Sequence, residues 1–218
     1  YMRWIAAVLD SHIQTHLNPE KLRITHLGGG ACSLARYCAD VYPNSRNTVV
    51  ELDAKLAEYV REWFDIPKSP RVKIRVGDAG TVTRSFAPAS RDVVIRDVFA
   101  VDKTPAELTG VDFVRTVDNS LAPGGLYILN CGDDRALNSA RAEAAALLEV
   151  FEYVSIVADS AMLKGRRRGN IILAGSHVPL PQLGSAEAAS ISRVLMGGGV
   201  PAQYWDTEKV RVFARKGA

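Results

Sequence analysis

Three consecutive glycines, Gly28 to Gly30, constrain the fold of this chain more than any other stretch. They follow an apolar segment that contains Ile24 and Leu27, and they precede a run from Ala31 to Val41 with helical spacing of its apolar residues. The order of strand, glycine turn and helix is typical of nucleotide-binding turns, because a backbone without Cβ can approach a ligand closely while the next helix directs free N–H groups at it. A tight strand-to-helix connection without a ligand is the alternative interpretation.

Strand and helix patterns alternate along most of the chain. Strands are predicted at 23–27, 47–53, 71–76, 91–97, 126–131, 151–157 and 169–174, and helices at 4–17, 31–41, 54–64, 104–121, 135–148, 186–195 and 207–214. This alternation predicts an α/β fold with a doubly wound, mostly parallel seven-stranded sheet and helices on both faces, in which the segment 71–76 is an edge strand. We expect one nucleoside-binding domain over residues 1–176, with a first helix over 1–18, and a C-terminal tail over 177–218 that packs on the same domain.

Acidic residues follow the glycine turn at the ends of successive predicted strands. Glu51, beside Leu52, lies about 20 residues after the glycines, where a strand-end carboxylate accepts both hydroxyls of a ribose in this architecture. Asp78 and Ala79 end the next strand, where a carboxylate can accept a hydrogen bond from the exocyclic amine of adenine. Asp97 ends the fourth strand, so all these residues should face one crevice.

A dinucleotide cofactor is not favoured by the glycine pattern. The third glycine of a dinucleotide motif is replaced by Ser33, so the ordered acids favour a nucleoside without a pyrophosphate. For each acid the alternative is structural: a solvated strand end for Glu51, an ordinary turn for Asp78, and a helix cap for Asp97.

Composition limits the other classes of partner. The net charge of +3 is small for 218 residues and gives no reason to expect nucleic acid or a membrane as partner, although the basic segment 164–168 could meet phosphates if it is not a solvated hairpin turn. No apolar run approaches the roughly 20 residues of a membrane span. Three cysteines without a CxxC pair favour reduced thiols, so we expect a cytoplasmic protein; a homodimer is left open.

No metal site is expected from the sequence. His12 and His16 lie four residues apart on the first helix, a spacing that can present two imidazoles to a metal ion. A third ligand is missing nearby, and so is the glutamate of an HExxH arrangement.

The combined motifs resemble one known family. The segments His26-Leu27-Gly28-Gly29-Gly30, Val50-Glu51-Leu52-Asp53, Gly77-Asp78-Ala79, Asp92 to Asp97 and Gly169 to Leu173 are similar to those of the spermidine synthase family, within the Rossmann-like class I methyltransferase fold. The resemblance covers residues 1 to about 176. The glycine turn and Glu51 are shared with methyltransferases in general, whereas the Gly-Asp-Ala turn and the strand that ends at Asp97 are more particular to this family.

The resemblance implies a ligand and a reaction. The ligand is S-adenosylmethionine, its decarboxylated form or methylthioadenosine, held by Gly28, Gly29, Gly30, Glu51, Leu52, Asp78 and Ala79, with no metal. Asp97 matches the family's catalytic aspartate, which assists an amine acceptor in its attack on a carbon beside a sulfonium. The implied activity is transfer of an aminopropyl group to a small-molecule amine; the alternatives are a methyltransferase, including one that modifies nucleic acid, and a non-catalytic nucleoside-binding domain.

Two positions depart from the family's pattern. The family has an aspartate directly after the three glycines and another three residues after the catalytic one, whereas this chain has Ala31 and Ala100. Diamines are dications at neutral pH, and burying an ammonium without a carboxylate partner costs several kcal/mol. The departures therefore argue against putrescine as the acceptor, unless Asp102 replaces a missing carboxylate.

Overall fold

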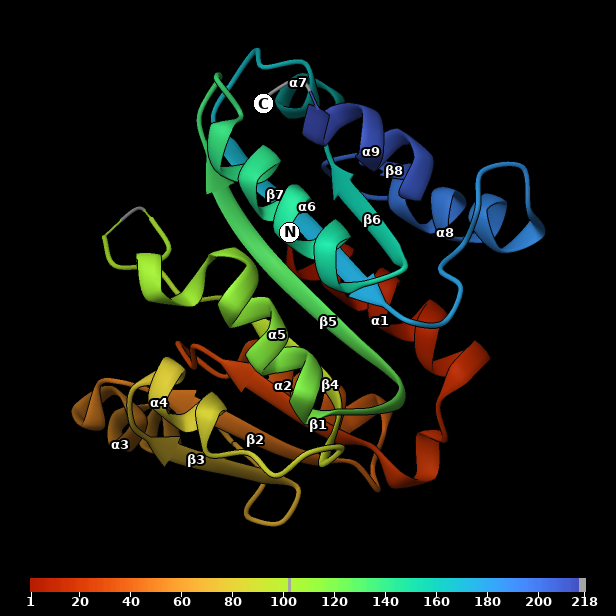
Figure 1. The fold of residues 1–218 in the computed structure, drawn as a ribbon. Helices are drawn as coiled ribbons and strands as arrows, with labels where there is room; N and C mark the ends of the chain where they lie inside the picture. Colours follow the sequence, from red (N-terminus) through yellow and green to blue (C-terminus); the bar gives the residue numbers. More distant parts are fainter. Residues whose placement is uncertain (102, 216–218) are drawn as a thin grey trace.

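The computed structural model describes residues 1–101 and 103–215, so Asp102 lies outside the described residues. One eight-stranded sheet runs through the molecule in the order β3-β2-β1-β4-β5-β7-β6-β8 (Figure 1). The strands are β1 Arg23–Leu27, β2 Arg46–Glu51, β3 Val72–Val76, β4 Arg91–Arg96, β5 Leu121–Asp133, β6 Tyr153–Ala158, β7 Gly169–Ser176 and β8 Gln203–Trp205. The helices are α1 Met2–His16, α2 Ser33–Val41, α3 Ala54–Trp63, α4 Ala79–Arg84, α5 Gly110–Ser120, α6 Asn138–Val150, α7 Ser160–Leu163, α8 Ala186–Met196 and α9 Thr207–Arg215.

Strand directions confirm the predicted mostly parallel α/β fold. The pairs β1–β2, β1–β4, β2–β3 and β4–β5 are parallel, whereas β7 runs antiparallel to both β5 and β6. Strand β3 lies at the edge, as its alternating pattern predicts. The chain reverses its order between β1 and β4, which is the switch point where ligands bind in open sheets of this kind.

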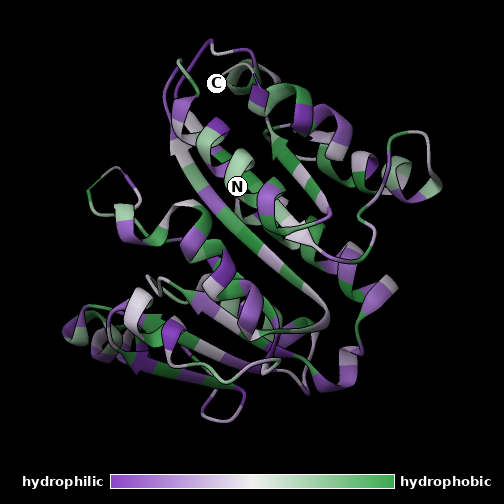
Figure 2. Cartoon of the chain, viewed as in Figure 1, coloured by the Kyte–Doolittle hydropathy of each residue, from purple (hydrophilic) through white to green (hydrophobic). Residues whose placement is uncertain are grey.

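Helices cover both faces of the sheet. On the face toward the viewer in Figure 1, α6 packs against α5 and α9, and α4 packs against α5; on the other face, α1 packs against α8 and β5. Hydrophobic residues are frequent along the strands, and they alternate with hydrophilic residues along the helices (Figure 2). The central strands are buried on both faces, as the continuous burial from Leu126 to Cys131 shows, and each such Leu or Ile contributes roughly 1.5–3 kcal/mol to stability.

The sheet has one strand more than the seven predicted, because Gln203–Trp205 joins it as β8, antiparallel to β6. Strand β5 is also longer than the strand predicted at 126–131, since it begins at Leu121 and continues through Pro123-Gly124-Gly125, a segment whose proline and glycines are typical of a turn. The register explains this: Arg91 pairs with Leu121 and Val93 with Leu126, so that the residues between them bulge out of the ladder. Gly124 allows the bulge with a φ of +78°.

Two connections differ from the sequence prediction. The segment expected to be helical over 104–121 begins with a 3-10 turn, Ala106–Leu108, and the α-helix begins only at Gly110. The basic segment 164–168 is not a simple hairpin turn, because α7 precedes it between the antiparallel strands β6 and β7.

The topology brings several strand termini to one edge of the sheet. The parallel strands β1 to β5 end there, and β7 begins there because it is antiparallel, with Asn170 paired to Gly132 at the end of β5. The loops that follow β1, β2, β3, β4 and β5 therefore lie along the same edge as the segment that precedes β7. No helix of the described residues is long and apolar enough to cross a bilayer.

Candidate active site

The glycine turn after β1 brings the ends of β1 and β4 into close contact. Gly28 has a φ of +91°, and a Cβ placed on it would overlap the backbone carbonyl oxygen of Asp97. The Asp97 N–H in turn donates to the carbonyl of Leu27 at 2.8 Å. Only glycine fits at position 28 without moving the backbone that carries Asp97.

Glu51 holds the same turn from the neighbouring strand. Its Oε2 accepts hydrogen bonds from the N–H groups of Gly29 at 2.9 Å and Gly30 at 3.1 Å, and its Oε1 accepts from the N–H of Asp53 at 2.9 Å. A Cβ on Gly29 would lie 2.9 Å from that Oε2. The carboxylate thus fixes the loop geometry, and ribose binding by Glu51 remains a prediction.

Leu52 directly follows β2, and Asp78 follows the neighbouring strand β3. Asp78 caps α4, because its carboxylate accepts from the Thr81 N–H at 2.7 Å. Hydrogen bonds from the Thr81 backbone and side chain hold the pKa of the Asp78 carboxyl below its usual value. Ala79 is buried behind it, whereas the Leu52 side chain is 74% exposed and offers an apolar surface beside Glu51. The predicted adenine contacts of these residues are not tested by the geometry.

Asp97 accepts hydrogen bonds from two side chains that are distant in the sequence. The Tyr1 hydroxyl donates to Oδ2 at 2.8 Å, and the Asn130 amide nitrogen donates to Oδ1 at 2.9 Å. Burial and the neighbouring Asp97 charge raise the pKa of the Tyr1 phenol above its usual value. The Asn130 nitrogen also donates to Oδ1 of Asn170 at 3.1 Å, which links β5 to the start of β7.

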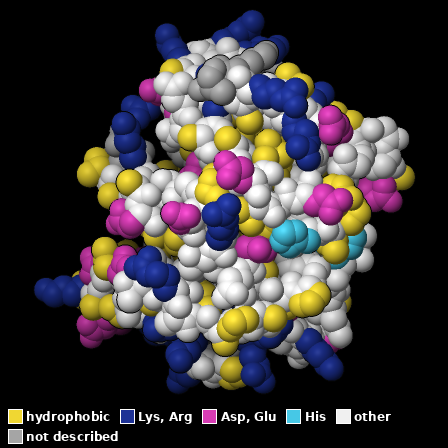
Figure 3. Space-filling model, in the orientation of Figure 1, with side chains coloured by type: hydrophobic (Ala, Val, Ile, Leu, Met, Phe, Trp, Pro, Cys, Tyr) yellow, Lys and Arg dark blue, Asp and Glu magenta, His cyan; other side chains and the backbone are white. Residues whose placement is uncertain are grey.

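Two cavities flank Asp97. A small one of about 40 Å³ lies against the glycine turn and includes Asp97, Gly28 and Gly29 in its lining. A larger one of about 560 Å³ has in its lining Tyr1 and Asn130, the two side chains that are hydrogen-bonded to Asp97, and also Asn170, whereas Asp97 itself is not among its described lining residues. Figure 3 shows a recess at the upper left of the molecule with basic side chains at its rim. Asp97 and the groups bonded to it therefore separate the glycine turn from a cavity that a small molecule can enter.

A buried ion pair lies directly behind Asp97. Arg96, the preceding residue, donates to Glu143 Oε1 of α6 at 2.5 Å and also to the carbonyl of Leu108. The two side chains are 0% and 5% exposed. Through these two hydrogen bonds, Arg96 connects the end of β4 to α6 and to the segment before α5.

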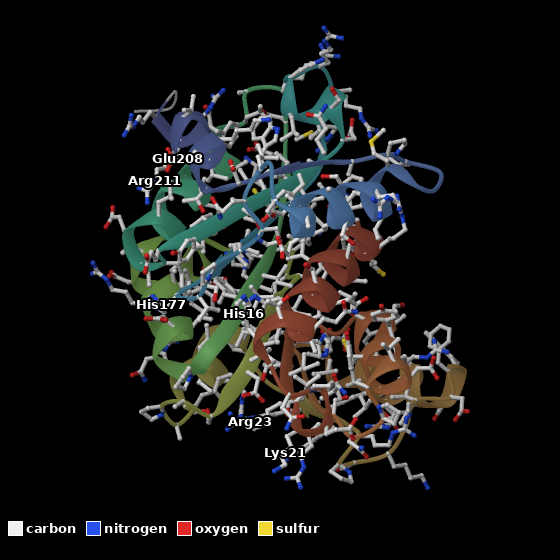
Figure 4. All side chains as sticks on the ribbon, turned by 90° about the vertical axis from the view of Figure 1, so that its right-hand side faces the viewer. His16, Lys21, Arg23, His177, Glu208 and Arg211 are labelled. Carbon is white, nitrogen blue, oxygen red and sulfur yellow. The ribbon has the colours of Figure 1, made fainter. Side chains whose placement is uncertain are left out.

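Most other charged pairs lie away from this edge. Arg23 pairs with Asp92 where β1 begins, at the opposite end of the strand, and Figure 4 shows Lys21 and Arg23 together there. Arg211 and Glu208 form an exposed pair on α9. In the basic segment 164–168, the Arg167 guanidinium donates a hydrogen bond to Asp159 Oδ2 at 2.7 Å and forms an ion pair with it. This contact stabilises the connection between β6 and β7.

The two histidines of α1 bind backbone carbonyl groups. Nε2 of His12 lies 2.8 Å from the Gly124 oxygen, and Nε2 of His16 lies 2.9 Å from the Pro179 oxygen. Burial lowers the pKa of His12 to about 4. Within residues 1–101 and 103–215, no group of three or more His, Cys, Asp or Glu side chains is arranged to hold a metal ion.

Sequence reasoning did not single out two amides of the site. Asn130 is a polar residue inside the apolar segment 126–131, and Asn170 is the second residue of the predicted strand 169–174. A polar residue in an otherwise buried strand can indicate a functional or structural hydrogen bond, because burying an amide costs free energy unless the amide is hydrogen-bonded. The sequence alone does not reveal that the two amides meet each other and Asp97.

No protein-family model matches the chain. Among curated proteins, it is 33% identical over 132 residues to the eEF1A lysine and N-terminal methyltransferase of Mus musculus and 26% identical over 114 residues to the polyamine aminopropyltransferase of Vibrio vulnificus. These matches cover 56% and 51% of this chain. The chain spans only 19% and 38% of the length of the two relatives.

Solved structures match over more of the chain. Human methyltransferase-like protein 13 in complex with SAH is 26% identical with a TM-score of 0.67, over 87% of this chain and 89% of that one. A probable spermidine synthase from Corynebacterium glutamicum is 61% identical with a TM-score of 0.96, over 98% of this chain and 77% of that one. At this identity and coverage, the chain belongs to the spermidine synthase family, within the Rossmann-like methyltransferase fold.

Proposed function

We propose that this protein binds a sulfonium nucleoside of the S-adenosylmethionine type and transfers its aminopropyl group to a small-molecule amine. The observation that carries the proposal is the position of Asp97, between the glycine turn and a cavity of about 560 Å³. One side of Asp97 is suited to the alkyl donor and the other to the acceptor. The family relationship supports the same assignment.

The donor is assigned to the glycine turn and the neighbouring strand ends. Glu51 would accept hydrogen bonds from the ribose hydroxyls, Asp78 would accept one from the adenine amine, and Leu52 would cover a face of the base. A solved spermidine synthase in complex with the transition-state analogue AdoDATO shares this fold at 15% identity. It supports the fold alone, and the residue assignments remain predictions from the strand-end positions of these residues and from the family resemblance.

Asp97 would act on the acceptor amine. The nitrogen lone pair attacks the donor carbon beside the sulfonium, a C–N bond forms, and the C–S bond breaks with its electron pair moving to sulfur, which leaves as a neutral thioether. The amine must lose a proton, which Asp97 can accept and pass to water. Hydrogen bonds from Tyr1 and Asn130 fix the direction of the carboxylate, so that it can also orient the amine.

Titration calorimetry with S-adenosylmethionine, decarboxylated S-adenosylmethionine and methylthioadenosine tests the donor site. We expect binding of at least one of the three. If none binds, the donor assignment is wrong.

Turnover of labelled decarboxylated S-adenosylmethionine with a panel of amines tests the reaction. We expect Asp97→Asn to lose activity while it retains donor binding. Asp112→Asn is the matched control, because Asp112 is fully exposed on α5. Equal activity of Asp97→Asn and the wild type would contradict the catalytic role, and donor binding without turnover on any amine would favour a non-catalytic domain.

Methyl transfer is the second candidate. It is favoured by the likeness to human methyltransferase-like protein 13 in complex with SAH, at 26% identity over most of both chains. The two reactions differ in the donor that is consumed. Turnover with S-adenosylmethionine but not with its decarboxylated form would assign methyl transfer.

A further inference from the structure

Arg96 is the last residue of β4 and directly precedes Asp97, the residue proposed to act on the acceptor. The Asp97 carboxylate is hydrogen-bonded to Tyr1, which precedes α1 on one face of the sheet, whereas the Arg96 side chain is bonded to Glu143 of α6 on the other face (Figure 1). Successive side chains of an extended backbone point to opposite faces. Because the two residues share a peptide bond, whatever fixes the Arg96 backbone also fixes the position of Asp97.

The Arg96 guanidinium connects two segments that line the cavity of about 560 Å³. It donates hydrogen bonds to the carbonyl of Leu108 and, at 2.5 Å, to Oε1 of Glu143. Leu108 belongs to the connection between β4 and α5, which contributes Phe99 and Lys103 to the lining. Glu143 belongs to α6, whose first two residues line the same cavity. One buried side chain thus joins the end of β4 to two walls of the proposed acceptor side.

A second cavity, of about 290 Å³, lies between these two segments. Thr104 and Thr109 line it from the connection between β4 and α5, and Ser139 and Glu143 line it from α6. Side chains on opposite sides of a cavity lack direct packing contacts with each other. The hydrogen bonds of Arg96 to both segments therefore fix a separation that packing at this place does not.

Stability alone does not account for the pair of Arg96 and Glu143. The two side chains are 0% and 5% exposed, and taking both charges out of water costs free energy. Nε of Arg96 and Oε2 of Glu143 also have no hydrogen-bond partner among the described residues, which adds to this cost. Apolar residues of similar volume often give equal or higher stability at such a position. A role in the geometry of the site explains what the charges contribute.

We propose that Arg96 and Glu143 are positioning residues: their ion pair holds Asp97 and the connection between β4 and α5 in the arrangement that binds and orients the acceptor amine. The proposal rests on the proposed function. The glycine turn, Glu51 and Asp78 follow β1, β2 and β3, whereas the pair connects β4 with α6. Loss of the pair should therefore impair the use of the acceptor and leave donor binding unchanged.

Two variants separate this role from a contribution to stability. Glu143→Gln keeps an oxygen that accepts from Arg96 but leaves the guanidinium without a carboxylate, whereas Arg96→Met/Glu143→Leu removes both charges and both hydrogen bonds. We expect Glu143→Gln to have the lower Tm of the two and yet to keep kcat within about threefold of the wild type. Arg96→Met/Glu143→Leu should have the higher Tm, but its kcat should fall at least about tenfold.

The assay uses decarboxylated S-adenosylmethionine with the fastest-reacting amine among putrescine, cadaverine and butylamine. In Arg96→Met/Glu143→Leu, KM for the amine should rise, while calorimetry should give an unchanged Kd for methylthioadenosine. Arg23→Met/Asp92→Asn is the matched control, because it removes an ion pair at the other end of β4 and should leave kcat and KM unchanged. A kcat of Arg96→Met/Glu143→Leu equal to that of the wild type, or above that of Glu143→Gln, would assign the pair to stability only.

Crystal structures of the two variants give a second measurement, which does not depend on turnover. The hydrogen bonds of Asp97 with Tyr1 and Asn130 should persist in Glu143→Gln and be lost in Arg96→Met/Glu143→Leu. Their persistence in both variants overturns the positioning role and leaves the proposed function intact. If the wild type binds no sulfonium nucleoside or thioether and no amine reacts, the proposed function fails, and the claim that the pair serves the acceptor fails with it.

Discussion

Removal of Glu143 should destabilise this protein strongly, because it leaves the guanidinium of Arg96 buried without its partner. The Arg96 side chain is fully buried, and its only carboxylate partner among the described residues is Glu143. Breaking such a pair by deleting one side costs about 3–5 kcal/mol. For a domain of about this size, each kcal/mol lowers Tm by roughly 2–4 °C, so Glu143→Ala should melt roughly 6–20 °C below the wild type.

Urea denaturation of Glu143→Ala at neutral pH measures this loss as a change in the free energy of unfolding. The control is Asp112→Ala, which removes a pair with Arg115 whose side chains are 63% and 102% exposed and which should change stability by less than about 1 kcal/mol. The double variant Arg96→Met/Glu143→Leu should be more stable than Glu143→Ala, since it removes both charges. A loss below about 1 kcal/mol in Glu143→Ala would refute the argument that the charge is desolvated.

Three further predictions follow from contacts near the site. Gly28→Ala should lower the free energy of unfolding by about 1–3 kcal/mol and weaken donor binding, because the new Cβ overlaps the Asp97 carbonyl. Gly30→Ala is the control and should lose less stability, because the space around its Cβ is open. Urea denaturation measures the stability of both variants and titration calorimetry measures their donor binding; equal losses in the two variants would contradict the predicted clash. Burial lowers the pKa of His26 from 6.5 to about 4, so that between these values the unfolded chain binds a proton that the folded one does not. The free energy of unfolding should therefore decrease as the pH is lowered from about 6.5 to about 4, by up to about 1.4 kcal/mol per pH unit. Urea denaturation at several pH values should show a smaller slope in His26→Gln, and an equal slope would contradict the lowered pKa. Tyr1→Phe removes a hydrogen bond to Asp97 and should lower kcat several-fold with little change in donor binding; an unaltered kcat would assign the hydroxyl a structural role only.

The sequence predicts the donor side of the site better than the acceptor side. Glycine turns and strand-end acids are local signals, so Glu51, Asp78 and Asp97 could be placed at strand ends along one edge from their order alone. Their roles toward a ligand stay predictions. The contact between Asp97, Asn130 and Asn170 depends on strand order and on the antiparallel direction of β7, which no local pattern encodes.

The differences in the fold have similar causes. The Pro123-Gly124-Gly125 segment is a strong turn signal, yet tertiary pairing of Leu121 with Arg91 extends β5 through it as a bulge. Strand β8 has only three residues, too few to show an alternating pattern, and its pairing with β6 is decided by the sheet. In both places, pairing with a strand that is distant in the sequence decides the backbone conformation, and the local sequence pattern does not.

Because β7 runs antiparallel to β5, the residues proposed to bind the donor and those that line the cavity beyond Asp97 come from different segments of the chain. Loops from β1 to β3 form the proposed donor side, whereas the cavity beyond Asp97 is built from the loop after β4, the end of β5 and the segment that leads into β7. The segment between β6 and β7 reaches this cavity without forming part of the donor crevice. If the proposed function holds, changes of length or charge there alter the acceptor side and leave the donor side unchanged, so that related proteins of one fold could share a donor and differ in the molecule that they alkylate.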